Sequence, residues 1–513
     1  MTTAPTAYDV VAYPGEPYPQ THPDRLATLA TLYGLTPAPP GRCRVLELGC
    51  GDAGNLVPMA YTLTESEFLG IDLASAALEK GREIIAALGL SNISLMAADL
   101  SAISDLGTFD YVIAHGVYSW VPPAVQERLL SLTREVLAAH GVAYVSYNAY
   151  PGRHVREALR QMMLWHVRGR EAPAERIEEA RGLIRLLAEG ASGHPVVSAI
   201  VTQALKEQER ERDAGLFHDD LAEINESLLF SEFVRRAEIS GLKFLSEADY
   251  SDMVVWNLRN PATRFLSGLG KDPLVQQQYR DFFVFRSLRQ TLLCRAETCP
   301  LSEPEAGALR GLFAASSTRP RSAEASLASR EPVAFSTERG GELTTSHPLT
   351  KAAFLVLGEE WPRWIAVPEL LVRGRERIAE AGGPSPDDED ERSLFRFLLQ
   401  GCGAEAVQLR SHPCPFVTAP TERPRASALA RLQASRGDAV TNLRHETVRL
   451  DDAVVRKLLS LLDGTRDRTA IENELALFRR EAAKPGDDPL PAALPAGIDS
   501  FLERIAKLAL LEA

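Results

Sequence analysis

The sequence predicts an α/β fold whose first part is a parallel β-sheet covered by helices. Three observations support this prediction: a glycine-rich turn follows an apolar strand, strand and helix patterns alternate as far as residue 150, and successive strands end in acids. Such alternation places ligands in a crevice at the carboxyl ends of the strands. Residues 1–150 are therefore expected to hold a nucleotide-like cofactor.

The first strand, residues 45–48, runs directly into the glycine-rich turn. The run Gly49-x-Gly51-x-x-Gly54 satisfies the dinucleotide fingerprint, whereas Glu47-x-Gly49-x-Gly51 is the pattern expected for S-adenosylmethionine (SAM). Asp52 would repel a pyrophosphate at the start of the next helix, but it tolerates the ammonium and sulfonium groups of SAM. Glu47 suits the same cationic portion, so the turn favours SAM.

The second and third strands, residues 67–72 and 93–98, are followed by helices and lead to acids that fit the same cofactor. Asp72 lies about twenty residues beyond the glycines, where a carboxylate can bind both ribose hydroxyls, and Asp99 is placed to meet an adenine amino group. Each acid could instead cap a helix. Three acids at the ends of successive strands, Glu47, Asp72 and Asp99, favour a shared role in binding the cofactor over chance. The cofactor-binding candidates are Glu47, Gly49, Gly51, Asn55, Asp72, Leu73, Asp99, Leu100 and His115.

The fourth strand, residues 109–114, opens into an aromatic loop, and a fifth strand is expected at 142–148 after a helix at 124–139. Aromatic faces attract methylammonium groups through cation-π contacts worth up to about 2 kcal/mol when desolvated. The alternative is that the aromatic residues of this region simply pack beneath a lid. The candidates for the methyl-acceptor site are Tyr118, Trp120, Tyr147 and Asn148.

These motifs resemble class I SAM-dependent methyltransferases. More narrowly, the chain resembles bacterial methyltransferases with a methyltransferase regulatory domain, a group that includes rickettsial protein lysine methyltransferases, in residues 13–26, 217–248 and 278–295. The resemblance implies SAM as cofactor and a lysine side chain on a protein or peptide as acceptor. Ala53 stands where the family has glycine, and we expect its methyl group to be tolerated at a negative φ. Tyr13 and His22 either close over SAM or serve the structure alone.

Beyond the fifth strand, helical patterns at 154–170, 174–187 and 196–205 precede strand patterns at 241–245 and 287–294. We therefore expect residues 151–299 to form a helical lid or regulatory domain that includes the last two strands of the sheet. An independent helical domain is the alternative. His218-Asp-Asp-x-x-Glu223 is better explained by a helix start with acids in its first turn than by a metal site.

Residues 300–345 are rich in Ser, Ala, Glu, Arg and Pro and are expected to form a flexible linker. The strand and helix patterns of residues 346–513 predict an α+β, winged-helix-like C-terminal domain. Winged helices often bind DNA, but the acidic segment 387–391 and the net charge of −13 favour protein interaction or scaffolding instead.

The composition fits a large bacterial enzyme, with 513 residues of which 45% are hydrophobic. We expect a cytoplasmic location with no membrane partner, because the sequence shows neither a signal peptide nor an apolar run long enough to span a bilayer. The six cysteines form no CxxC pair, so we expect them to be reduced. The excess of 69 acidic over 56 basic residues argues against nucleic acid and favours a basic protein or peptide substrate.

Three functions compete at this point. The resemblance favours a protein lysine methyltransferase. The same sheet also serves methyltransferases for small metabolites or peptide natural products, because fold does not determine substrate. A non-catalytic SAM-binding interaction protein is the third, which the intact glycines and acids disfavour.

Overall fold

An eight-stranded sheet forms the centre of the N-terminal half, in the strand order β3-β2-β1-β4-β5-β8-β7, with β6 paired to β5 off this path. The computed structural model describes residues 10–11, 13, 15–190, 194–209, 212–256, 258–270, 272–322, 326–337, 341–482 and 497–512. All neighbouring strands run parallel except β8, which is antiparallel to β5 and β7. The strands are β1 (Arg44–Leu48), β2 (Glu67–Asp72), β3 (Ile93–Ala97), β4 (Phe109–Ala114), β5 (Leu137–Ala149), β6 (Ser227–Leu228), β7 (Leu242–Glu247) and β8 (Leu288–Arg295).

Helices cover both faces of this sheet, which explains why its central strands are apolar along their whole length. On one face, α2 (Pro23–Leu32) and α3 (Leu56–Thr62) pack against Tyr111 and Tyr144, with α4 (Ser75–Leu88) beside them. On the other face lie α5 (Pro123–Val136) and α10 (Phe230–Ile239). The predicted Rossmann-like sheet is thus confirmed, although β5 begins earlier than the predicted residue 142.

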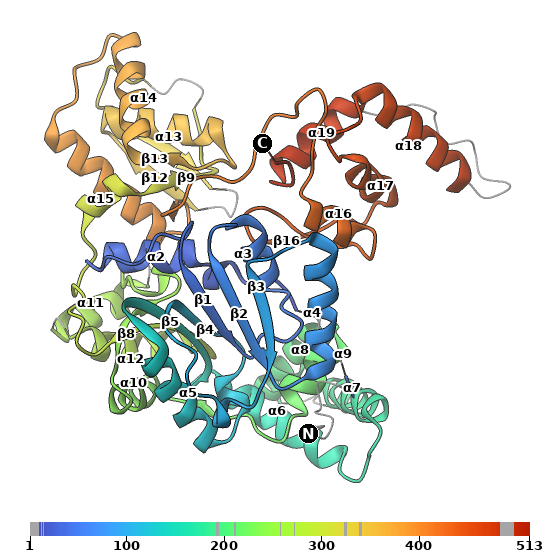
Figure 1. Cartoon of the computed structure of the whole chain (residues 1–513). Helices are drawn as coiled ribbons and strands as arrows, with labels where there is room; N and C mark the ends of the chain where they lie inside the picture. Colours follow the sequence, from blue (N-terminus) through green and yellow to red (C-terminus); the bar gives the residue numbers. More distant parts are fainter. Residues whose placement is uncertain are drawn as a thin grey trace.

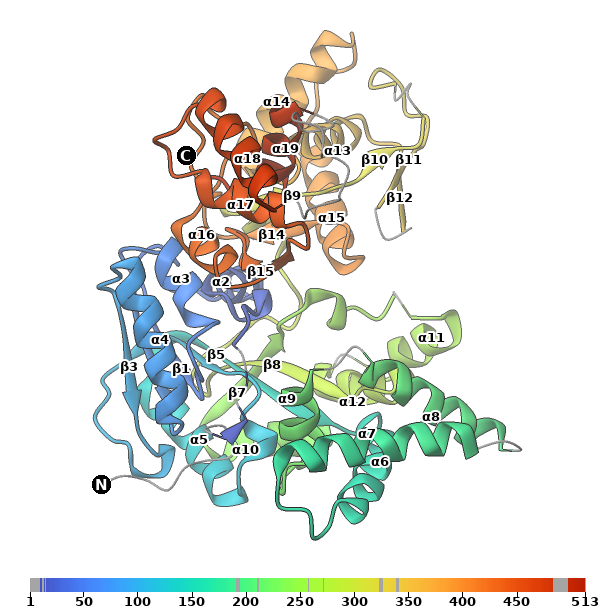
Figure 2. The same cartoon turned by 90° about the vertical axis from the view of Figure 1, so that its right-hand side faces the viewer.

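A helical insertion leaves the sheet after β5 and returns to it at β6. It consists of α6 (Arg153–His166), α7 (Pro173–Gly190), α8 (Pro195–Gln208), α9 (Asp213–Gly215) and the π-helix η4 (Leu216–Asp220). These helices share an apolar core of their own. They lie on the side of the sheet opposite to the C-terminal half of the chain (Figure 1; Figure 2). No described helix combines the length and the apolar character that a membrane span requires.

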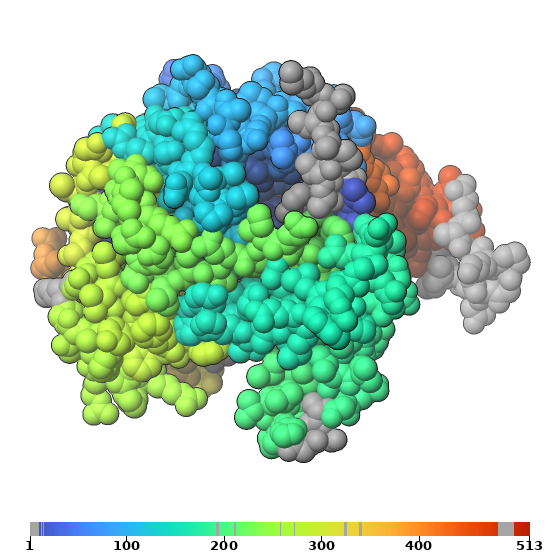
Figure 3. Space-filling model, turned by 90° about the horizontal axis from the view of Figure 1, so that it is seen from below, coloured from blue at the N-terminus to red at the C-terminus, as the bar shows by residue number. Residues whose placement is uncertain are grey.

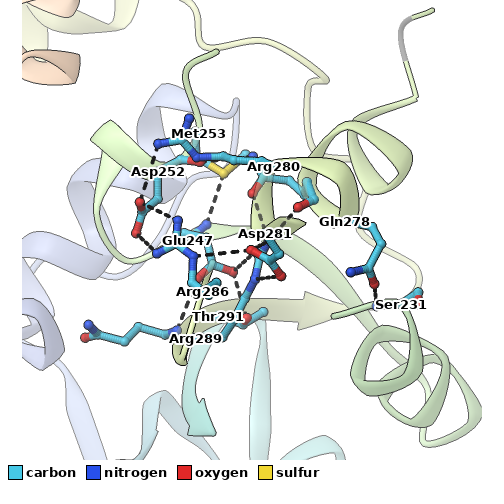
Figure 4. Close-up of polar contacts among 12 residues, drawn as sticks. Ser231, Glu247, Asp252, Met253, Gln278, Arg280, Asp281, Arg286, Arg289 and Thr291 are labelled. Atoms are coloured by element: carbon cyan, nitrogen blue, oxygen red, sulfur yellow. Dashed lines mark hydrogen bonds and ion pairs between the residues drawn. The ribbon is translucent and has the colours of Figure 1, made fainter. Parts of the chain in front are cut away.

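A buried ionic network joins α12 (Pro273–Val284) to β8 (Figure 4). The guanidinium of Arg289 on β8 is 0% exposed. It donates to Glu247 of β7 at 2.7 Å and binds both carboxylate oxygens of Asp281 of α12 at 2.7 and 2.9 Å. Its charge also lies over the ring of Phe230, 4.0 Å from the centroid. Both carboxylates are removed from water and need a compensating charge. Arg289 supplies it to Glu247, and to Asp281 together with Arg286, which donates to Asp281 at 3.2 Å.

Two units follow the sheet. The first contains η6 (Ala306–Gly311), β9 (Phe313–Ala315), β10 (Arg319–Pro320), β11 (Val333–Ser336), β12 (Glu342–Thr345), α13 (Pro348–Glu360), β13 (Ile365–Ala366), α14 (Val367–Glu380), α15 (Asp388–Gly403) and β14 (Gln408–Arg410). The expectation of a flexible linker over 300–345 is wrong for the described residues there, because Leu309, Leu312, Phe335 and Leu343 enter the core of this unit.

The second unit contains α16 (Ala428–Ala434), the hairpin of β15 (Ala439–Thr441) and β16 (Thr447–Arg449), and then α17 (Ala453–Leu461), α18 (Arg468–Ala482) and α19 (Gly497–Lys507). It has a separate apolar core. It also contacts the sheet side directly, because the hydroxyl of Tyr61 on α3 accepts a bond from the backbone of Ala428 and donates to Glu512. In Figures 1 and 2 both C-terminal units lie above the sheet.

Candidate active site

The turn after β1 brings the chain close to the loop that follows β4. Gly49 has φ 76, and a Cβ at this position would lie 2.3 Å from the side chain of Val117. Gly51 also has a positive φ of 55, and its N–H donates to the carboxylate of Asp72 at 2.8 Å. The glycines therefore allow a conformation and an approach that residues with side chains could adopt only with strain.

The third glycine of the turn serves a contact with the N-terminal segment. A Cβ on Gly54 would lie 2.5 Å from the backbone of Gly15, so the two segments of the chain cross where there is no room for a side chain on Gly54. Asp52 holds this crossing, because its carboxylate accepts bonds from the N–H groups of Gly15 and Gly54 at 3.2 and 3.0 Å. The Gly-x-Gly-x-x-Gly spacing thus has a packing explanation that does not involve a pyrophosphate.

Ala53 differs from the expectation in its backbone conformation. Its φ is 60, in the left-handed region, so the negative φ under which the methyl group was expected to be tolerated is not present. The turn requires this conformation whichever residue occupies it, which explains why glycine is usual in the family. The methyl group is fully buried in the core beneath α3, and this burial offsets part of the conformational cost of about 1–2 kcal/mol.

Glu47, the residue before the last of β1, has a buried carboxylate of which one oxygen is hydrogen-bonded. Its side chain is 3% exposed, Oε1 accepts from Asn55 Nδ2 at 2.7 Å, and Oε2 has no hydrogen-bond partner among the described residues. Burial raises the pKa of Glu47 to about 8. A buried carboxylate oxygen without a partner is costly. It fits the cationic end of a ligand such as the ammonium group of SAM.

The two acids at the ends of β2 and β3 are held by backbone N–H groups. Asp72 is half-buried and accepts from Gly51 and Ala74, each at 2.8 Å. Asp99 is exposed and caps a short 3-10 helix through the N–H of Ser101. Register pairs Asp72 with Ala97, so both acids lie on the same edge of the sheet. Beside them, Leu73 is 43% exposed and Leu100 is half-buried.

His115, directly after β4, meets an aromatic residue from the N-terminal segment. Its ring centroid lies 3.8 Å from that of Tyr18, and its Nδ1 is 2.9 Å from the hydroxyl of Tyr144. Burial lowers the pKa of His115 to about 4, so the ring is neutral near pH 7. Sequence reasoning did not include Tyr18. It lies within residues 13–26 of the family resemblance, but no pattern linked it to the sheet.

The two other N-terminal candidates, His22 and Tyr13, make contacts with their neighbours in the fold. His22 caps α2 by accepting from the N–H of Asp24, which is the structural alternative for this histidine. Tyr13 makes an edge contact with the ring of His218. His218 Nε2 lies 2.6 Å from the backbone carbonyl of Val11. In the described part of the chain no three metal-ligating side chains gather.

Two of the proposed acceptor-site aromatics are core residues. Tyr118 is 1% exposed and Tyr147 0% exposed, and both rings pack against Phe233 of α10 at centroid distances of 5.3 and 3.9 Å. Helix α10 covers this face of the sheet, as in the packing alternative for these aromatic residues, and a role of Tyr118 in the acceptor site stays a prediction. Trp120 is half-buried, and its Nε1 finds no partner in the part of the chain that the structure describes.

Asn148, near the end of β5, connects the sheet to the helical insertion. Its Nδ2 donates to Asn225 Oδ1 at 2.7 Å, and Asn225 in turn donates to the backbone carbonyl of Asp219 in the π-helix at 2.7 Å. π-helical turns are rare and frequently occur at functional sites. Asn225 was missed as a site residue, although the segment that contains it was part of the family resemblance.

A hollow lies between the sheet and the insertion. In Figure 3 it is lined by dark blue residues from the start of the chain, with lighter blue and cyan residues on one side and green residues on the other. The turn after β1, the ends of β2 and β4 and the N-terminal segment thus converge on one crevice. This is the place where an α/β sheet binds its ligand.

Comparison with known proteins agrees with this geometry. Three family profiles match: "Methyltransferase domain" over residues 45–141, "Predicted methyltransferase regulatory domain" over 212–295, and "PKMT, C-terminal winged helix domain" over 422–510. An uncharacterized protein of Rickettsia prowazekii is 27% identical over 98% of this chain and 93% of its own length. Another from the same organism is 30% identical over 47% of this chain and 96% of its own length.

Among solved structures, PKMT2 from Rickettsia typhi in complex with AdoHcy is similar over nearly the whole molecule. The TM-score is 0.84 at 25% identity, and the alignment covers 97% of this chain and 99% of PKMT2. The winged helix is thereby confirmed for the last unit. The chain therefore belongs to the class I SAM-dependent methyltransferases that carry a methyltransferase regulatory domain, in a bacterial family that includes these rickettsial proteins.

Proposed function

We propose that the chain transfers methyl groups from SAM to lysine side chains of a protein or peptide. The observation that carries this proposal is the similarity to PKMT2, which spans the sheet, the insertion and both C-terminal units rather than the cofactor-binding half alone. The matched PKMT-type winged helix supports the same class of enzyme.

The three acids and His115 each have a distinct task in this proposal. Glu47 would bind the ammonium group through its free oxygen, Asp72 the ribose hydroxyls and Asp99 the adenine amino group. His115 and Tyr18 would form an aromatic wall of the crevice. When bound, SAM supplies a methyl group on a sulfonium that an incoming lone pair can attack.

The chain's own residues would chiefly hold the acceptor in line with that methyl group, because positioning supplies most of the acceleration in such a transfer. Asn148 and Asn225 carry amide groups beside the acceptor side of the crevice and would orient the incoming amine. The amine must first lose a proton. Burial beside a cation lowers the pKa of a lysine, so no dedicated base is required.

The acceptor is tested by incubating the purified enzyme with a bacterial lysate and SAM carrying an isotopically labelled methyl group. Mass spectrometry is expected to find labelled lysine side chains in proteins. The control is the Asp72→Ala variant, which should leave the lysate unlabelled. Label confined to small molecules would refute the lysine acceptor and would favour a metabolite methyltransferase.

Glu47 predicts a pH dependence of SAM binding. Burial raises the pKa of Glu47 from 4.5 to about 8, so its carboxyl is protonated at neutral pH in the free protein. The contribution of Glu47 to the stability of the folded chain therefore falls as the pH rises from 4.5 to about 8. A bound ammonium group favours the carboxylate, so binding should release a proton. Affinity is expected to rise by up to about tenfold from about pH 6 to about pH 7.

This dependence is measured by titration calorimetry at both pH values in buffers of different ionisation enthalpy, which report the released proton. Glu47→Gln is the matched control, because an amide cannot titrate; it should bind more weakly and with little change between the two pH values. Equal affinity of the unmodified protein at both values would contradict the role of Glu47.

A further inference from the structure

The loop between β15 and β16 reaches from the winged helix to the turn of the cofactor crevice. At its tip, the Nε2 atom of His445 lies 2.9 Å from Oδ1 of Asn55, the residue that precedes α3. Both side chains are buried, at 5% and 4% exposure. The contact joins residues that are 390 positions apart in the sequence.

Asn55 is surrounded by partners on every side. Its Oδ1 accepts from the Tyr18 N–H and faces His445, each at 2.9 Å, and its Nδ2 donates to Glu47 at 2.7 Å and to Thr21 at 3.0 Å. A carboxamide has two lone pairs and two N–H groups, so these four partners fill it. The amide of Asn55 thus holds Glu47 in place, and this contact gives Asn55 an indirect route to the cofactor beside the direct contact predicted from the sequence.

The surrounding bonds determine which atom of His445 carries a proton. The backbone N–H of Tyr18 can only donate, so the Asn55 atom that it meets is the oxygen. His445 faces the same oxygen and must donate from Nε2. Burial lowers the pKa of His445 well below its ordinary value, so the ring is neutral and this is its single N–H.

The loop is built to hold His445 in this position. The side-chain oxygen of Asn442 accepts from the N–H groups of Arg444 and Glu446 at 3.0 and 2.9 Å. Arg444 also donates to the carbonyl of Pro362 at 2.8 Å, and Leu443 donates to Ala509 at 2.9 Å. His445 itself has a φ of 62, a conformation that non-glycine residues adopt at a cost and that concentrates at functional sites.

A second buried contact, between α2 and the segment that follows β14, lies near this loop. The buried carboxylate of Asp24 on α2 accepts from the backbone N–H groups of Ser411 and His412 at 2.5 and 3.1 Å. The ring of His22, which caps α2, lies 5.2 Å from that of His445. The N-terminal segment, the cofactor turn and the C-terminal units thus meet at one buried point.

We propose that the winged helix completes the SAM site, with His445 as a positioning residue that orients Asn55 and, through it, the carboxylate of Glu47. The proposal rests on the assignment of Glu47 to the cofactor. A winged helix is expected to recognise a partner, whereas here its hairpin would serve the cofactor of the same chain. Docking of the C-terminal unit and SAM binding would then be coupled, each favouring the other.

The first experiment measures SAM binding to the full chain by calorimetry. His445→Ala is expected to weaken binding by about tenfold, since the loss of one buried hydrogen bond in a network has this size. With saturating SAM, kcat should change less than KM for SAM. His445→Gln, whose amide can still donate, should recover most of the affinity. Arg449→Ala on the same hairpin, 57% exposed, is the matched control and should bind normally.

A double-mutant cycle separates positioning from general loss of structure. In a Glu47→Gln background, His445→Ala should cost little further affinity if it acts through Glu47. An equal loss in both backgrounds would overturn the proposal, as would a His445→Ala variant that binds SAM as tightly as Arg449→Ala does. No acceptor is present in these titrations, so a wrong lysine assignment leaves them unaffected, whereas an unmodified protein that fails to bind SAM refutes the cofactor assignment itself.

Discussion

Replacing Arg289 with leucine is expected to destabilise the protein by about 3–5 kcal/mol, the range for removing one partner of a buried ion pair. The substitution leaves Glu247 without its arginine and removes one of the two arginines that pair with Asp281, since Arg286 stays 3.2 Å away. The two carboxylates are 1% and 0% exposed. Neither carboxylate can reach water without opening the contact between α12 and β8. The change is measured by urea unfolding of the unmodified and variant chains.

The matched control is Arg235→Leu on α10, whose side chain is 58% exposed and pairs at the surface with Glu232. It should unfold at the same urea concentration as the unmodified chain. A triple variant that also carries Glu247→Gln and Asp281→Asn should recover part of the loss, because the uncompensated charges are gone. Unchanged stability of Arg289→Leu would show that the network contributes no net stabilisation.

The second large effect is expected from Asp72→Ala, which should weaken SAM binding by about 100-fold or more. Hydrogen bonds to a charged group contribute about 1.5–3 kcal/mol each, and two ribose hydroxyls would lose their acceptor. The N–H of Gly51 also loses its partner, so the turn itself becomes less well ordered. Calorimetric titration with SAM measures the change.

Glu67→Ala provides the control at the opposite end of the same strand. Its carboxylate is 72% exposed and pairs only with Arg44 at the surface, so SAM affinity should be unchanged. Thermal unfolding without ligand checks that the Asp72→Ala variant is folded. If that folded variant bound SAM with normal affinity, Asp72 could not be the ribose ligand.

The sheet and its crevice could be predicted because their signals are local. Apolar runs mark β1, β2 and β4, and glycines mark the turn after β1, so the positions of these strands and of their ends follow from the local sequence. Glu47, Asp72 and Asp99 were predicted at strand ends. Asp72 ends β2, Glu47 lies one residue before the end of β1, and Asp99 follows the end of β3 by two residues. Short strands such as β9 and β11 escaped detection because a few residues carry too little pattern.

The contacts between distant segments could not be predicted from local patterns. Nothing around Tyr118 shows that Phe233 of α10 will cover its ring. Nothing near Asn55 indicates that a histidine of the winged helix will lie beside it. The left-handed backbone of Ala53 also depends on the turn as a whole, since alanine alone prefers a negative φ. Tertiary packing decided each of these positions.

The pairing of β6 with the end of β5 has a consequence for how this enzyme family can change. Asn148 lies opposite Ser227, so the chain leaves the sheet and re-enters it on adjacent strands, about 5 Å apart. A segment whose two ends lie together can be lengthened, shortened or exchanged without moving the strands that flank it. The helices between β5 and β6 can therefore be exchanged as one unit, while the strands that end at the cofactor crevice keep their places.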